Sequence, residues 1–298
     1  MSQSEFMATE IESQPETWRE GARLAAGPSC PLPAAGLRVA VVGCGTSWFM
    51  AQAYAARREA AGQGVTDAFA ASEAPVTSRD YDAVVAISRS GTTTEVLQLL
   101  SRVRGRIPSV AIIGDPDTPM AGAADAVLPL PFADERSVVQ TRFATTTLIL
   151  LRAHLGEDVA PAIADADAAL RRPVEPEWVA AEQFSFLGRG WTCGLANEAA
   201  LKMREASQSW TESYPAMEYR HGPISIAAPG RVTWMFGPAP AGLREEVTDA
   251  GALFVQHDGD PLADLVLVQR VALERARARG LDPDTPRHLT RSVVLGPR

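Results

Sequence analysis

Two stretches of similar design decide the fold of this chain: VAVVGCGTSWF at residues 39–49 and FSFLGRGWTCG at residues 184–194. Each begins as an apolar strand, breaks at a Gly-x-Gly turn and continues into a helical pattern. The stretches begin about 145 residues apart, which is typical of an internal duplication. The repeat predicts two α/β halves built on the same plan.

Further apolar runs predict the remaining elements. In the first half we expect strands at residues 37–42, 68–72, 82–87, 109–113 and 126–129, and helices at 48–61, 95–103 and 135–154. In the second half we expect strands at 184–187, 231–236, 251–255 and 265–268. An opening helix at 8–26 tolerates Pro15 only near its start or at a kink. The expected class is α/β, with two doubly wound, flavodoxin-like parallel sheets.

Composition sets the expected domain boundaries. We expect an N-terminal helix and connector at 1–36, a phosphate-binding subdomain at 37–156, a linker at 157–178 and a second subdomain at 179–298. The linker is enriched in Ala and Asp, with Pro173 and Pro176 near its end. The second subdomain would carry the catalytic helix and the C-terminal tail.

Charge and cysteine content exclude several classes of function. The 28 basic and 36 acidic residues give a net charge of −8, which argues against nucleic acid or an anionic membrane as partner. The three cysteines have neither the number nor the spacing of a disulfide framework or a zinc site. We therefore expect reduced thiols, no metal and no cofactor. No apolar run is long enough to span a membrane and the N-terminus is polar, so we expect a soluble cytoplasmic protein.

Hydroxyl side chains crowd the turn SRSGTTT at residues 88–94, between an expected strand and an expected helix. Each hydroxyl can donate a hydrogen bond, and the amino end of a helix adds about half a positive charge. This concentration favours a phosphate cradle; helix capping, which needs only one such residue, is the alternative. Gln140 and Thr141 could reach the same anion. The turn GCGTS at 43–47 is a weaker anion site, since it lacks the full dinucleotide spacing and a generic α/β turn explains it equally well.

A charged row is expected on the helix that follows residue 190. Glu198, Lys202 and Glu205 stand at i, i+4 and i+7, so they project from one strip. A neighbouring strip reads as the core face and comprises Ala199, Met203, Ala206 and Trp210. A charged row at the margin of the core is suited to a cleft. The alternative is an ordinary ion pair on a solvated face.

Taken together, these motifs resemble the sugar isomerase (SIS) domain family. The order GCGTSW, ISRSGTTTE, ERSVVQTRFATT, FLGRGW, ALKMREAS, EYRHGP and PRHLTRSVV is similar to the isomerase half of glucosamine-6-phosphate synthase and to its stand-alone relatives. The resemblance covers nearly the whole chain, and we expect no counterpart of the synthase's glutamine-hydrolysing half.

The resemblance implies a role for each matching residue. The implied phosphate and sugar ligands are Thr46, Ser47, Ser88, Arg89, Ser90, Thr93 and Gln140. Glu205 matches the glutamate that moves a proton between C1 and C2, with Glu198 and Lys202 in support. His221 matches the histidine that opens the sugar ring and that a homodimer contributes across its interface.

Position 291 departs from the family. The synthase has a lysine there that forms a Schiff base, whereas this chain has Arg291, which stays protonated and cannot attack a carbonyl. Its guanidinium could hold the phosphate or a hydroxyl instead. A solvated tail residue is the alternative.

Three functions fit these residues. The first is C2 proton abstraction on an amino-sugar 6-phosphate, giving aldose-ketose isomerisation or, when the 2-amino group is free, deamination. The second is a lyase that dehydrates N-acetylglucosamine 6-phosphate by 2,3-elimination, which needs no Schiff base. The third is a sugar-phosphate sensor without catalysis, although such regulators usually carry a second module.

Overall fold

The computed structural model describes residues 5–28 and 30–296. They fall into two compact units, each assembled from separate segments. The five-stranded unit contains residues 16–136, 142–159 and 289–296; the four-stranded unit contains 5–15, 137–141 and 160–288. Two α/β sheets of the expected class are therefore present.

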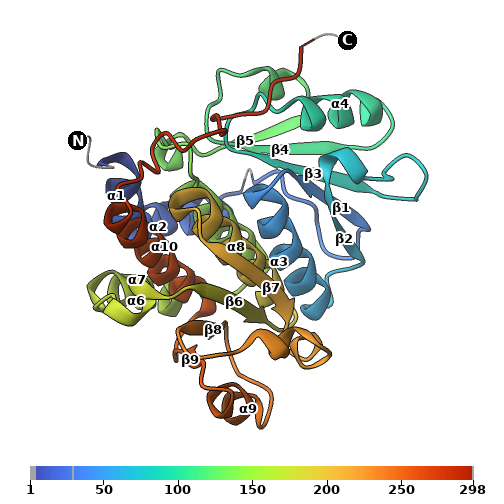
Figure 1. The fold of residues 1–298 in the computed structure, drawn as a ribbon. Helices are drawn as coiled ribbons and strands as arrows, with labels where there is room; N and C mark the ends of the chain where they lie inside the picture. The colour runs from blue at the N-terminus through green and yellow to red at the C-terminus, as the bar shows by residue number, and fades with distance from the viewer. Residues whose placement is uncertain (1–4, 29, 297–298) are drawn as a thin grey trace. The chain divides into compact units, whose positions relative to one another are not determined.

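The five-stranded sheet is parallel throughout, in the order β2-β1-β3-β4-β5 (Figure 1). Its strands are β1 (Val39–Gly43), β2 (Thr66–Ala70), β3 (Ala83–Ser88), β4 (Ser109–Ile113) and β5 (Ala126–Pro129). Its helices are α3 (Thr46–Ala60), α4 (Thr94–Val103) and α5 (Arg142–His154), with 3-10 turns η1 (Ala71–Glu73), η2 (Pro119–Gly122) and η3 (Pro131–Ala133). The strand order reverses between β1 and β3, the position where doubly wound sheets bind their ligands.

The four-stranded sheet is also parallel, in the order β7-β6-β8-β9. This order repeats that of the first four strands of the other sheet, as a duplication predicts. The strands are β6 (Gln183–Gly188), β7 (Trp210–Pro215), β8 (Arg231–Met235) and β9 (Leu253–Gln256). The helices are α1 (Glu5–Glu12), α6 (Ala160–Arg171), α7 (Pro176–Ala180), α8 (Thr192–Ser207), α9 (Leu243–Asp249) and α10 (Pro261–Ala278), with 3-10 turns η4 (Glu218–Arg220) and η5 (Pro223–Ile226).

Most expected strands are confirmed within two residues, and β4 and β5 match residue for residue. The strand expected at 265–268 is wrong, because these residues lie in α10. All four side chains are buried, so the run lacks the alternation of apolar and polar residues that marks an amphipathic helix. The start signals of α10 were readable: Asp260 accepts a hydrogen bond from the Leu262 amide, and Pro261 occupies the first turn.

Three other expectations need correction. The helix expected at 135–154 begins only at Arg142, because Glu135 folds back and its carboxylate accepts the Arg142 amide at 2.8 Å. Trp210 is not on the core face of α8; that helix ends at Ser207, and Trp210 begins β7 with 76% of its surface exposed. The opening helix is two helices, α1 and α2 (Gln14–Ala25), and Pro15 occupies the first turn of α2. The stretch 157–178, expected as a linker, contains helix α6, and the expected domain boundaries stay a prediction.

Arg275 of α10 is a fully buried cation that joins three segments of the four-stranded unit. Its guanidinium donates to the carbonyls of Trp178 and Val179 at 2.8 and 2.6 Å and to Ser209 Oγ at about 3 Å, and it lies over the Phe184 ring. Burial, followed by the nearby Arg279, lowers the pKa of Arg275 to about 10. The polar contacts therefore offset the desolvation of this charge.

Replacing Arg275 tests this joint. Arg275→Met leaves the two carbonyls without their donor, and we expect it to lower the free energy of unfolding by about 2–4 kcal/mol in urea titrations. Arg275→Lys keeps a donor and should lose less. A loss below about 1 kcal/mol for the methionine variant would contradict the assignment.

Candidate functional site

Two glycine-containing turns lie at the carboxyl ends of strands β1 and β3 in the five-stranded sheet. Strands β1 and β3 are direct neighbours, with Val42 paired to Ala86, so the turns that follow them lie side by side. Thr46 and Ser47 open α3 and are buried. Gly45 has φ 53°, a backbone conformation that side chains disfavour. The turn thus aims the amino end of α3 at the switch point between β1 and β3.

The hydroxyls of the turn after β3 converge on Thr93. Its Oγ1 lies 3.4 Å from both Ser88 Oγ and Ser90 Oγ. Ser88 Oγ also accepts the Gly91 amide at 3.2 Å, which folds the turn tightly. Gly91 has φ 61°, and a Cβ there would lie 2.0 Å from Thr118 Oγ1, so only glycine fits. We name residues 88–94 the hydroxyl loop.

Ser90 Oγ accepts the Thr92 amide at 3.3 Å, but the Thr93 side chain does not cap α4. Thr93 is the N-cap residue of α4, yet its side chain makes no capping bond. The Thr94 amide is satisfied by the Val293 carbonyl at 3.2 Å instead. The loop therefore presents hydroxyls that can donate to an anion at the amino end of α4.

Arg89, within the hydroxyl loop, and Arg291, beside it, both contact protein groups. Arg89 is buried; its Nη1 lies 3.9 Å from Glu135 Oε2, and its Nη2 donates to the Arg291 carbonyl at 3.0 Å. Arg291 donates to Asp134 Oδ1 at 2.6 Å and to the Glu135 carbonyl. The guanidinium of Arg291, expected to bind phosphate or a hydroxyl, is thus engaged by Asp134 and Glu135.

The charged row on α8 forms a connected triad. Lys202 Nζ lies 2.5 Å from Glu205 Oε2 and 3.4 Å from Glu198 Oε1. The side chains of Lys202 and Glu198 are each 1% exposed, whereas that of Glu205 is 20% exposed. This arrangement is not a solvated surface pair. It leaves Glu205 as the carboxylate of the triad that solvent can reach.

Gln140 and His221 belong to the four-stranded unit, as does α8. Gln140 is half-buried, and its Oε1 has no hydrogen-bond partner among the described residues. His221 follows η4 and is exposed. The hydroxyl loop belongs to the five-stranded unit. The expectation that these residues share one ligand stays a prediction.

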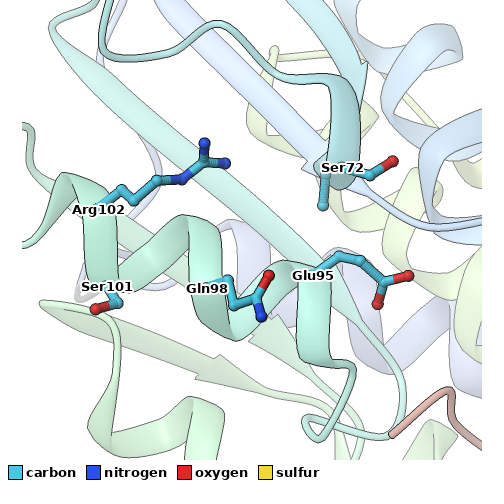
Figure 2. Close-up of a pocket in the computed structure, with 6 residues that line it drawn as sticks. Ser72, Glu95, Gln98, Ser101 and Arg102 are labelled. Carbon is cyan, nitrogen blue, oxygen red and sulfur yellow. The ribbon is translucent and has the colours of Figure 1, made fainter. Parts of the chain in front are cut away.

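A pocket of about 480 Å³ lies between η1 and α4 (Figure 2). It is lined by Ala71, Ser72, Glu95, Gln98, Ser101 and Arg102. None of these residues was expected in the site, although Glu95, Gln98 and Arg102 share one face of α4 by their spacing. Glu95 Oε2 is buried and has no hydrogen-bond partner among the described residues. One wall of the pocket therefore contains a carboxylate, Glu95, with one oxygen buried from solvent.

Cys44 and Cys193 are poor nucleophiles. Burial, reinforced by Glu95, raises the pKa of the Cys44 thiol to about 11, and burial raises the pKa of Cys193. Both thiols therefore stay protonated near neutral pH. Within residues 5–28 and 30–296, no cluster of three His, Cys, Asp or Glu side chains is arranged to hold a metal ion. No helix in the same ranges is both long and apolar enough to cross a membrane.

Comparison with known proteins gives a consistent result. The SIS domain family matches residues 34–155. A glutamine–fructose-6-phosphate aminotransferase (isomerizing) from Pyrobaculum aerophilum is 26% identical over 97% of this chain and 57% of its own length. One from Bradyrhizobium diazoefficiens is 29% identical over 97% of this chain and 59% of its own length. This chain spans little more than half the length of these relatives.

Solved structures extend the likeness to the whole chain. A glucosamine-6-phosphate deaminase from Thermotoga maritima has a TM-score of 0.80 at 25% identity and covers 97% of this chain and 99% of its own. The C-terminal domain of a glucosamine-fructose-6-phosphate aminotransferase from Francisella tularensis has a TM-score of 0.80 at 22% identity, covering 96% of this chain and 100% of its own; at that identity it supports the fold alone.

Proposed function

We propose that this chain, whose residues 34–155 form a SIS domain, is an enzyme that abstracts the C2 proton of an amino-sugar 6-phosphate. With a free 2-amino group, moving the C2 proton to C1 gives a 2-ketimine, which water hydrolyses to a ketose phosphate and ammonia. The observation that carries the proposal is the triad on α8, in which a partly exposed carboxylate, Glu205, contacts a buried ammonium, Lys202. The similarity to a deaminase and to aminotransferases supports this substrate class.

The phosphate is held by the hydroxyl loop. Ser88, Ser90 and Thr93 donate hydroxyls, and Thr46 and Ser47 add the amino end of α3. Each turn follows one of two neighbouring strands, so both sets of donors face the same edge of the sheet. Binding energy at a dianion remote from the reacting carbons can orient those carbons against a fixed base.

Proton transfer is assigned to the four-stranded unit. His221 opens the sugar ring by exchanging a proton with the ring oxygen, a task suited to imidazole. In a homodimer, the partner subunit's His221 would act on the same sugar. Glu205 removes the proton from C2, the C1 carbonyl becomes an enol, and Glu205 returns the proton to C1. Lys202 stabilises the developing negative oxygen. With a free amine the product is a ketimine, which water hydrolyses to the ketose phosphate and ammonia.

The function is tested with glucosamine 6-phosphate and N-acetylglucosamine 6-phosphate in D2O, followed by proton NMR. We expect loss of the C2 proton signal and release of ammonia or formation of ketose phosphate from the free amine. A 2,3-unsaturated sugar from the acetylated substrate would replace this proposal with the lyase. Tight binding of both sugars without any exchange at C2 would replace it with the sensor.

A further inference from the structure

We propose that Arg291 is a positioning residue: it holds the C-terminal segment 290–295, the strap, against the hydroxyl loop and does not contact the phosphate. The inference rests on the proposed function, because the hydroxyl loop is assigned there to phosphate binding. It assigns Arg291 a role at the position where the family carries a lysine.

The strap is bonded directly to the anion-binding end of α4. The Val293 carbonyl accepts the Thr94 amide at 3.2 Å, and the Leu295 amide donates to Thr94 Oγ1 at 2.9 Å. Ser292 Oγ lies 3.4 Å from Thr93 Oγ1, the atom on which the loop hydroxyls converge. These contacts set the position of the first turn of α4 and of Thr93. Figure 1 shows the red C-terminal segment passing α4.

The hydrophobic effect contributes little to holding the strap. Val293, Val294 and Leu295 are 54%, 68% and 54% exposed. Little apolar surface is removed from water, so polar contacts must keep the strap in place. Among these contacts, the ion pair of Arg291 with Asp134 at 2.6 Å is reinforced by a second bond to the Glu135 carbonyl.

Arg291 also joins the strap to the interior of the loop. Its backbone carbonyl accepts Arg89 Nη2 at 3.0 Å, and Arg89 stands between Ser88 and Ser90. The side chain of Arg291 thus ties the strap to Asp134 and Glu135, while its backbone carbonyl holds the buried guanidinium of Arg89. Losing the ion pair should loosen both connections.

Asp134→Asn separates the two roles that Arg291 can play. If the guanidinium binds phosphate, removing the Asp134 charge frees it and phosphate binding tightens or stays the same. If Arg291 positions the strap, the same change weakens phosphate binding, as Arg291→Gln does. The charge swap Asp134→Arg with Arg291→Asp restores an ion pair and should restore binding only under the positioning role.

The experiment compares four full-length variants with the wild type: Asp134→Asn, Arg291→Gln, the double swap, and the control Arg23→Gln, which breaks an exposed pair with Glu20 in the same unit. Calorimetry measures binding of inorganic phosphate, and kinetics separates KM from kcat. For each single variant we expect phosphate binding to weaken and KM to rise about 5-fold, with kcat within about 2-fold. The swap should return both to within about 2-fold, and the control should change neither.

Hydrogen exchange keeps this test separate from the proposed function. Peptides covering residues 290–295 should exchange faster in both single variants and as slowly as wild type in the swap, whether or not the chain turns over a sugar. Unchanged exchange in the single variants overturns the positioning role. So does Asp134→Asn binding phosphate at least as tightly as wild type. A wild-type chain that binds no phosphate overturns the proposed function, while the exchange result still decides the role of Arg291.

Discussion

Glu205→Gln is expected to slow exchange of the C2 proton by about a thousandfold, because an amide cannot act as the base. The change is nearly isosteric. The amide oxygen of the new side chain can still accept from Lys202 Nζ, which lies 2.5 Å from Glu205 Oε2. The side chain is 20% exposed, so the substitution should leave the helix folded. The loss should therefore lie in kcat, measured as deuterium incorporation at C2.

Phosphate binding supplies the internal control. The hydroxyl loop belongs to the five-stranded unit and α8 to the four-stranded unit, so Glu205→Gln should bind inorganic phosphate as the wild type does. Glu274→Gln on α10 is the matched surface change, since Glu274 is 43% exposed and forms an exposed ion pair with nearby Arg277. Exchange at the wild-type rate in Glu205→Gln would remove this residue as the base.

Local patterns in the sequence predict much of the fold. The β4 run is apolar on both faces because it lies inside a parallel sheet, and its bounds follow directly from the pattern. The repeated Gly-x-Gly turns predict the shared strand order of the two sheets. The spacing of Glu198, Lys202 and Glu205 predicts that their side chains meet. In each case neighbours in sequence or on one helix face carry the information.

Some features escaped the sequence because they depend on contacts between residues distant in sequence. Residues 135–141 read as a helix start, yet Glu135 is drawn toward Arg89 and the Arg291 segment. Asp134 engages Arg291 from 157 positions away, while the expected phosphate contact of Arg291 stays a prediction. No local pattern reports such partners. The same limit applies to Glu95, whose place in a pocket depends on η1.

Lys202 carries the second large effect, on stability rather than on turnover. Its ammonium is buried between Glu205 and Glu198, and the Glu198 side chain is 1% exposed. Lys202→Met removes this ammonium from both Glu205 and the buried Glu198. We expect the free energy of unfolding to fall by about 3–5 kcal/mol, since losing one partner of a buried pair exposes the full desolvation cost of the other.

The double variant Glu198→Gln with Lys202→Met should recover most of this loss, because it removes the buried charge together with its partner. Arg277→Met provides the exposed counterpart: its pair with Glu274 is 43% exposed on both sides, so it should cost about 0.5 kcal/mol or less. Urea unfolding of the variants measures all three values. The contrary outcome is that Lys202→Met lowers the free energy of unfolding no more than Arg277→Met does. The triad would then behave as a solvent-exposed ion pair, and the assignment of a buried ammonium beside Glu205 would be wrong. A large loss that the double variant reverses would instead show that most of the cost lies in the buried Glu198–Lys202 pair.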